Sequence, residues 1–243
     1  MSETVPLDLS VDRVFLDGEI VGSLTLSPAK TVAFSYESSW LSSGFSISPL
    51  SLPLREGVFV AKRDPLHGLF GAFDDSMPDG WGRLLTDRLL RQRGIDPYSI
   101  GTLTRLSIVG SSGMGALEYE PAADIENGVA ATDLDDIARE CANLLETDFS
   151  EDLDQLFALG GSSGGARPKI LTEVDGEEWI IKFPSSVDSA NIGEQEYQIS
   201  VLARECGIDM PETRLFASAQ CSGYFGVRRF DRTRDDDGTE HKV

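Results

Sequence analysis

The chain has 243 residues, of which 40% are apolar and 26% are charged, a composition with room for one large domain or two modest ones. Its formal net charge of -20 argues against a protein that holds DNA or RNA alone, because free nucleic-acid binders present a basic face. No apolar run approaches the roughly 20 residues of a membrane-spanning helix. The start, MSETVPLDLS, lacks the basic and apolar segments of a secretory signal, so we expect a cytoplasmic protein without membrane contact.

The first stretch, residues 11–121, is rich in alternating patterns and turns. Residues 14–22 (VFLDGEIVG) predict a strand, an Asp-Gly turn and a second strand, which is a strong short-range hairpin signal. Residues 24–26 continue the second strand, Pro28 interrupts it, and residues 32–36 resume the β character.

A helix is predicted to begin after Pro78 and to end at Gly94. Its apolar face follows from spacings of three and four among residues Trp81, Leu84, Leu85 and Leu89. We expect Asp79 to cap this helix and Trp81 to lie in the core, with no catalytic role for the acidic residues nearby. Two further short elements are predicted at residues 103–109 and 116–119.

Residues 122–154 form an acidic segment in which Asp and Glu outnumber Arg and Lys by eleven to one. An apolar period of helical type persists inside it, at Leu134, Ile137, Ala138, Cys141, Leu144 and Leu145. The segment therefore predicts one amphipathic helix with a solvated acidic face, which connects the regions on either side.

Residues 155–243 form a second unit with the order glycine-rich loop, strand, turn, strand, helix, strand, strand. The turn at 174–177 separates the strands 170–172 and 179–181, and the helix runs from Glu194 to Glu205. Ile199, Leu202 and Cys206 line one face of that helix, and Gly207 ends it. Strands follow at 213–216 and 224–230.

Cysteine and acidic residues give no metal-site pattern. Cys141, Cys206 and Cys221 are odd in number and widely spaced, which predicts buried thiols rather than disulfides or a C-x-x-C site. The aspartate run at 235–237 fits a solvated turn better than a ligand set. We predict no metal site in this chain.

The stretch from Gly160 to Lys169, GGSSGGARPK, is the most informative one. Four glycines in six positions rule out a good helix or strand interior, and they let backbone N–H groups approach a phosphate. The loop does not fit the G-x-x-x-x-G-K-[ST] pattern, since Ala166 and Arg167 follow Gly165, nor does it fit G-x-G-x-x-G. Taken alone, a glycine-serine loop of this kind is more often a flexible turn than a phosphate cradle.

A lysine in the next apolar strand changes this balance. Lys182 lies in the run WIIKFP, where an unpaired ammonium is costly to bury. It either reaches solvent at an edge or faces a cleft and holds an anion. In kinases a strand lysine contacts nucleotide phosphates and a glutamate from the following helix pairs with it, a role open here to Glu194 and Glu196.

The chain resembles the HipA family, kinase toxins of bacterial type II toxin–antitoxin systems. In the second unit the resemblance rests on GGSSGGARPK, WIIKFP, LARECGIDMP at 202–211 and RFDR at 229–232. In the first unit it rests on FLDG at 15–18, LSLPL at 50–54, FDDSMPDGWGR at 73–83 and GMGAL at 113–117. These motifs span nearly the whole chain, and their order and spacing carry more weight than any one of them.

The resemblance implies an α+β fold, with a β-rich N-terminal subdomain at 1–121, an acidic helical connector at 122–154 and a kinase-like small lobe at 155–243. That lobe would be an antiparallel sheet plus a helix. The implied ATP-binding residues are Ser163, Gly164, Gly165, Ala166, Arg167, Lys169, Lys182, Glu196, Arg228, Arg229 and Phe230. Ser162 or Ser163 matches the loop serine whose autophosphorylation silences family members, with Ser162 favoured by its distance from Lys169.

The family's helical lobe, which carries the catalytic aspartate and the Mg²⁺ ligands, is expected to be absent from this chain. We therefore expect an ATP- and Mg²⁺-dependent serine/threonine kinase toxin that is inactive without that lobe, with no catalytic residue in this chain. The alternative is a non-enzymatic module that docks an antitoxin or a separate kinase half. The implied partners are a HipB-type helix-turn-helix antitoxin and possibly a separate C-terminal half, with DNA reached only through the antitoxin.

Overall fold

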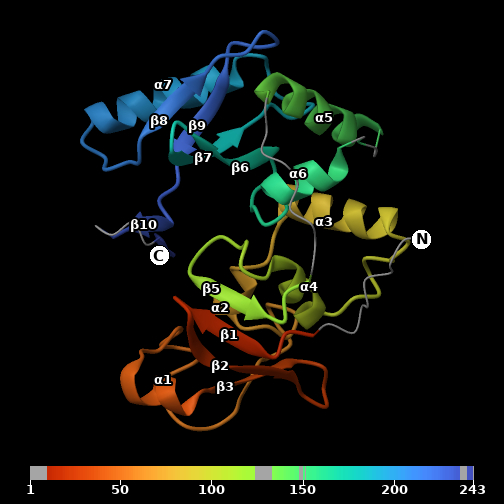
Figure 1. The fold of residues 1–243 in the computed structure, drawn as a ribbon, viewed down its shortest axis with the longest axis vertical. Coiled ribbons are helices and arrows are strands. Elements are labelled where there is room, and N and C mark those ends of the chain that lie inside the picture. Colours follow the sequence, from red (N-terminus) through yellow and green to blue (C-terminus); the bar gives the residue numbers. More distant parts are fainter. Residues whose placement is uncertain (1–9, 124–132, 148–149, 151, 236–239, 243) are drawn as a thin grey trace. The chain divides into compact units, whose positions relative to one another are not determined.

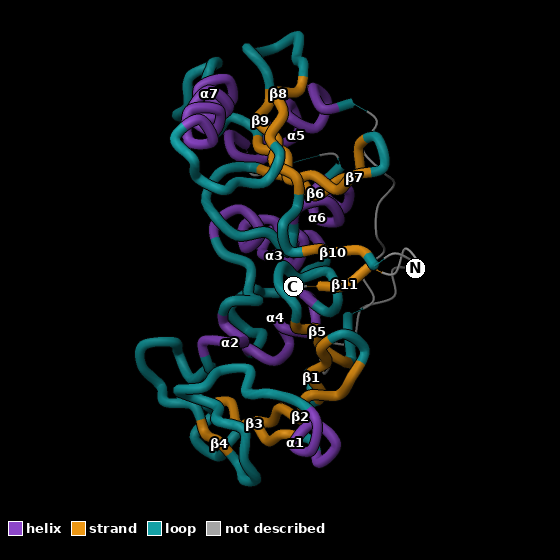
Figure 2. The backbone as a smooth tube through the Cα atoms, turned by 90° about the vertical axis from the view of Figure 1, so that its left-hand side faces the viewer, coloured by secondary structure: helices purple, strands orange, loops and turns teal. Residues whose placement is uncertain are grey.

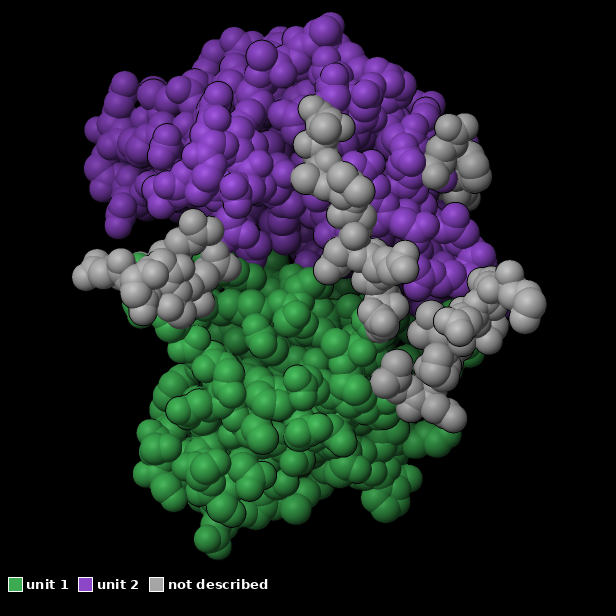
Figure 3. Space-filling model, in the orientation of Figure 1, with its two compact units in different colours: residues 1–78, 95–125, 231–243 green, residues 79–94, 126–230 purple. Residues whose placement is uncertain are grey.

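The computed structural model describes residues 10–123, 133–147, 150, 152–235 and 240–242. These residues form two compact units, one built from residues 1–78, 95–125 and 231–243 and the other from residues 79–94 and 126–230 (Figure 3). The units interleave along the chain, because the helix predicted after Pro78 belongs to the second unit. The domain boundaries inferred from the family resemblance stay a prediction. The predicted mixture of helices and antiparallel sheets is confirmed.

Unit 1 is built on a five-stranded antiparallel sheet in the order β4-β3-β2-β1-β5 (Figures 1 and 2). Its strands are β1 (Arg13–Leu16), β2 (Glu19–Leu26), β3 (Val32–Tyr36), β4 (Phe59–Val60) and β5 (Leu117–Glu120). The predicted hairpin is confirmed, since β1 pairs with β2 across Asp17 and Gly18, whose φ angles of 52° and 78° suit this tight turn.

Unit 1 also contains the helices α1 (Ser38–Ser43), α2 (Gly71–Asp74) and α4 (Thr102–Val109). Strand and helix residues share one core, in which Val14, Phe34, Phe73 and Leu106 are at most 1% exposed. A short hairpin of β10 (Arg232–Arg234) and β11 (Glu240–Lys242) joins this unit, where Lys242 pairs with Glu118 at 2.8 Å. Of the predicted aspartate turn, Asp235 pairs with His241 at 2.9 Å, and residues 236 and 237 lie outside the described residues.

Unit 2 is built on a four-stranded antiparallel sheet in the order β6-β7-β9-β8. The strands are β6 (Lys169–Val174), β7 (Glu177–Lys182), β8 (Thr213–Phe216) and β9 (Tyr224–Arg228). All four were predicted from the sequence, and so was α7 (Ile192–Glu205), which contacts β8 and β9. In both views of the backbone the sheet lies between α7 and α5 (Figures 1 and 2).

The other face of that sheet carries the core of unit 2. Ile170, Trp179 and Ile181 are almost fully buried, and they pack with apolar residues from three helices. These helices are α3 (Gly80–Gln92), α5 (Leu134–Thr147) and α6 (Leu153–Gly160). The acidic segment thus contributes the predicted helix, α5, whose Ile137, Cys141 and Leu144 face inward.

The expectation of buried thiols was wrong for Cys206 and Cys221. Cys141 is buried, but Cys206 is exposed and Cys221 is only partly covered, and none of the three forms a disulfide. The apolar face predicted for α7 is turned to solvent, with Ile199 66% and Leu202 58% exposed. The side of α7 against the sheet is instead lined by small residues, Gly193 and Ser200, because this helix lies too close to β9 for larger ones.

Among the described residues, no helix combines the length and the apolar character that crossing a bilayer requires.

Candidate anion-binding site of unit 2

The glycine-rich loop joins α6 to β6, and its first half is tightly packed. α6 extends to Gly160, one position into the predicted loop, and a Cβ there would stand 2.5 Å from the carbonyl oxygen of Lys169. Ser163 is fully buried, and its Oγ and backbone N–H donate to the Gly160 carbonyl at 2.6 and 3.1 Å. Hydrogen bonds therefore fix the entrance of the loop, which distinguishes it from a simple flexible turn.

The tip of the loop is held by the start of α3 and by the residue that precedes it. Gly165 adopts φ +83°, a conformation that favours glycine. Its carbonyl accepts a hydrogen bond from the Trp81 backbone N–H at 2.8 Å, and its own N–H donates to a carboxylate oxygen of Asp79. The neighbouring carbonyl, that of Gly164, accepts from the ammonium of Lys169.

The role predicted for Asp79 was therefore wrong. Asp79 occupies the N-cap position of α3, but its side chain makes no capping hydrogen bond and reaches the loop instead. Trp81 is buried as expected, and its indole N–H donates to the Lys169 carbonyl at 3.1 Å. The contact between Asp79 and Gly165 joins residues 86 positions apart, so the local patterns that predict caps carried no signal for it.

The two lysines predicted for ATP binding face each other across β6 and β7. Lys169 pairs directly with Lys182 in the antiparallel register, so both side chains stand on the same face of the sheet. Lys182 forms an ion pair with Glu196 of α7, and its Nζ lies 5.2 Å from the centre of the Phe225 ring. Glu194 instead accepts a hydrogen bond from Gln198 at 3.3 Å. Of the two glutamates left open by the sequence, Glu196 is the lysine's partner.

Arg167, at the exit of the loop, extends the same network. Its guanidinium contacts both carboxylate oxygens of Asp188 at 3.0 Å and Glu196 at 3.4 Å. The Ser185 hydroxyl and N–H also donate to Asp188, and these bonds, together with Arg167, hold the pKa of its carboxyl below the usual value. Bidentate pairing of this kind fixes the orientation of an arginine.

Electrostatics link the loop and the strand lysines. Burial lowers the pKa of Lys169, and the nearby charge of Lys182 lowers it further, while Asp79 and Glu196 act in the opposite direction. Two cations and two carboxylates therefore share one partly desolvated environment. Such a site, with loop N–H groups beside it, suits a multiply charged anion such as a phosphate chain.

The remaining predicted residues lie in two places. Ser162 is half-buried and Ala166 is exposed, both on the loop. The other three residues, Arg228, Arg229 and Phe230, lie at and beyond the end of β9. This end is away from Lys182, because Arg228 pairs with Trp179, three residues before Lys182 on β7. Arg228 and Arg229 form ion pairs with Glu177 at 2.9 Å and Glu178 at 3.7 Å, and Phe230 is 64% exposed. The structure therefore gathers residues 163–169, Lys182 and Glu196, and sets residues 228–230 apart along the sheet.

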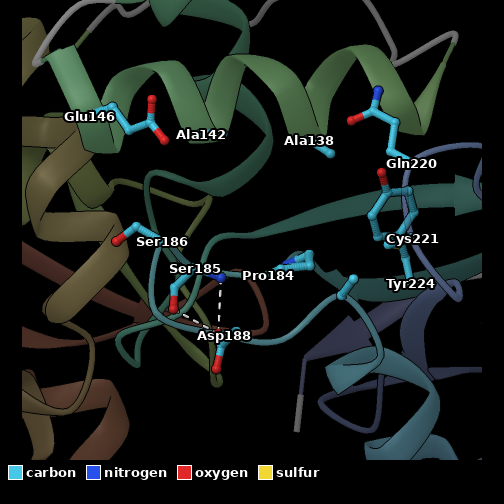
Figure 4. A pocket seen from close by; sticks show the side chains of 11 residues that line it. Ala138, Ala142, Glu146, Pro184, Ser185, Ser186, Asp188, Gln220, Cys221 and Tyr224 are labelled. Carbon is cyan, nitrogen blue, oxygen red and sulfur yellow. Dashed lines mark hydrogen bonds between the residues drawn. The ribbon is translucent and has the colours of Figure 1, made fainter.

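A pocket of about 280 Å³ lies between α5, the segment after β7 and the β8–β9 connection (Figure 4). No sequence motif indicated this pocket. Its wall includes Asp188, whose hydrogen bonds to Ser185 are drawn in Figure 4, so it adjoins the Arg167 network. Among the residues that the structure describes, no group of three His, Cys, Asp or Glu side chains is arranged to hold a metal ion.

Comparison with known proteins agrees with the resemblance. Residues 13–120 match the model of the HipA N-terminal domain, and residues 161–243 match that of the HipA-like C-terminal domain. A protein of Sinorhizobium fredii named "Putative kinase Y4mE" is 27% identical over 262 residues, which cover 98% of this chain and 58% of that protein.

A solved structure shares the fold. It is the HipA toxin–antitoxin complex of Shewanella oneidensis with HipB and operator DNA, which matches with a TM-score of 0.60 at 18% identity. The match covers 96% of this chain and 54% of the other, so the chain spans little more than half the length of both relatives. The two domain models together cover most of the chain, and they place it in the HipA family.

Proposed function

We propose that unit 2 binds the phosphates of ATP as the small lobe of a HipA-type protein serine/threonine kinase, a toxin of a type II toxin–antitoxin system. The observation that carries this proposal is the ion pair between Lys182 on β7 and Glu196 on α7 beside the glycine-rich loop. Kinases use such a strand lysine, held by a helix glutamate, to contact nucleotide phosphates.

The residues present fit a triphosphate better than they fit a metal ion. Lys169, Lys182 and the loop N–H groups offer donors that match phosphate oxygens. In the described part of the chain, the carboxylates near the loop are engaged by lysine, arginine or backbone donors, and no three are grouped as a metal site. We therefore assign Mg²⁺ ligation to no residue described here, and we propose that phosphoryl transfer needs a helical lobe that supplies those ligands.

The predicted autophosphorylation site falls on the packed half of the loop. Ser163 is fully buried and donates to Gly160, whereas Ser162 is half-buried. A phosphate at Ser163 would require the loop entrance to open, so we propose Ser162 as the modified residue. A group carrying close to two negative charges there would repel the phosphates of ATP.

A helix-turn-helix antitoxin of HipB type is the proposed partner. The support is the structural relative, which was determined with HipB and its operator DNA. With a net charge of -20, this chain would reach DNA through that partner rather than by direct contact.

The test is a calorimetric titration of ATP–Mg²⁺ into the 243-residue protein and its Lys182→Met variant. Loss of a charge-assisted contact to phosphate is expected to weaken binding roughly 10- to 100-fold. Lys62→Met, at an exposed lysine of unit 1, removes the same charge and should leave affinity unchanged. Equal affinity of the Lys182→Met variant and the unmodified protein would refute the proposed site.

A further inference from the structure

The loop of unit 2 contains an anion site that the chain itself already fills. A main-chain donor, the Gly165 N–H, points at the Asp79 carboxylate, and the Lys169 ammonium bonds the adjacent carbonyl of Gly164. A Cβ at Gly164 would stand 2.9 Å from the Asp79 Oδ1, and one at Gly165 would stand 3.0 Å from the Lys169 Nζ. The carboxylate and the ammonium therefore lie on either side of the same two glycines.

This carboxylate makes no capping bond to α3, and the loop it contacts has further anchors. The loop is held independently by the Trp81 backbone N–H, which donates to the Gly165 carbonyl, and by the Trp81 indole, which donates to the Lys169 carbonyl. What Asp79 adds, and an uncharged residue of the same shape would not, is a negative charge at the tip of the loop.

A phosphate group entering this loop needs the same donors. The Gly165 N–H, which bonds Asp79, is a main-chain donor of the kind that cradles phosphate, and the Lys169 ammonium lies beside it at the Gly164 carbonyl. A phosphate oxygen and the Asp79 carboxylate carry like charges, so both cannot share these donors at short range without a large electrostatic cost.

We propose that Asp79 is a built-in occupant of the phosphate site, which holds Gly165 when no nucleotide is bound and lowers nucleotide affinity by competing for it. This inference rests on the function proposed above, and it adds a residue that sets the affinity of that site. Nucleotide entry then requires the Asp79 side chain to turn away from the loop.

The test compares the 243-residue protein with its Asp79→Asn variant, which keeps the shape and the acceptor oxygen but removes the charge. Calorimetry measures binding of ATP–Mg²⁺ and, separately, of inorganic tripolyphosphate. The variant is expected to bind both roughly three- to tenfold more tightly, a modest gain because the site is partly screened by solvent. Asp175→Asn is the matched control, since it removes a charge from a turn of the same unit at the far end of β6.

The outcomes separate this inference from the proposed function. Equal or weaker binding by Asp79→Asn, with its thermal unfolding midpoint unchanged, overturns the proposed competition. Tighter tripolyphosphate binding by the variant, with no ATP binding by either protein, supports the occupied anion site and refutes the nucleotide function. If Asp79→Asn lowers the unfolding midpoint, the change in affinity is measured at a temperature where both proteins are folded. Asp79→Ala must then change the affinity in the same direction.

Discussion

The closest backbone approach near the proposed site is between α7 and β9, and replacement of Gly193 by alanine tests its importance. Gly193 is the second residue of α7 and is buried against the Gly223–Phe225 segment. A Cβ at this position would stand well under 3.0 Å from the Gly223 carbonyl oxygen and 3.1 Å from the Phe225 nitrogen. Both neighbours are backbone atoms, so no side chain can rotate away, and the start of α7 must move.

The expected cost follows from two opposing effects. Overpacking of a well-packed site costs about 1–3 kcal/mol. Alanine in place of glycine favours the helix by up to about 1 kcal/mol, and by less in the first turn. The net change in the free energy of unfolding should therefore be a loss of about 1–2 kcal/mol. Glu196 lies on the next turn of α7, so its ion pair with Lys182 should lengthen and ATP affinity should fall as well.

Urea unfolding followed by tryptophan fluorescence measures the first effect, and ATP–Mg²⁺ calorimetry measures the second. Gly71→Ala is the matched control, because Gly71 begins α2 and its nearest neighbour would be 3.7 Å from the new Cβ, an ordinary contact. A Gly193→Ala protein as stable as the unmodified one would show that α7 can withdraw from β9 without penalty. The link from helix packing to the site would then be refuted.

Two further predictions concern the same unit. Hydrogen bonds from Ser218, the Ala219 N–H and Tyr224 lower the pKa of Asp135 in the folded protein. The ionised carboxyl therefore stabilises the fold at pH values above its unfolded pKa of about 3.9, and this stabilisation is lost as pH falls through its folded pKa. Urea midpoints should therefore show Asp135→Asn less stable than the unmodified protein at pH 7 and closer to it at pH 2–3, and an equal difference at both pH values would contradict this reasoning. Trp81→Phe removes the donor to the Lys169 carbonyl and should cost about 1–3 kcal/mol in the same measurement, and no change would contradict the role given to that bond.

Local patterns were sufficient for most of the secondary structure. The Asp17–Gly18 hairpin, the helix after Pro78, the acidic α5 and the four strands of unit 2 all depend on turn residues and periodicity within a few positions. An ion pair between Lys182 and a glutamate of α7 was also within reach, and the family resemblance, not the spacing, favoured Glu196 over Glu194.

Contacts between distant segments could not be predicted in this way. Asp79 reads locally as a cap, and only the return of the chain 86 residues later reveals the loop that it contacts. The apolar stripe of α7 likewise reads as a core face, yet Gly193 and Ser200 form the buried side, because close packing on β9 selects small residues over large ones. In both cases a tertiary contact overrides a local preference, which sequence periodicity does not report.

The contacts of the three carboxylates at the site indicate which one must give way when an anion enters. Glu196 is held by two cations, Lys182 and Arg167, and Asp188 is held by Arg167 and twice by Ser185. The Asp79 carboxylate, by contrast, bonds the Gly165 N–H, and its nearest cation, Lys169, directs its hydrogen bond to a carbonyl. Displacing Glu196 or Asp188 would leave partly buried cations without their partners, which costs more than turning one aspartate to solvent. Entry of a phosphate chain should therefore exchange Asp79 for phosphate at the Gly165 N–H, while the pairs around Arg167 and Lys182 keep the strand and helix in place.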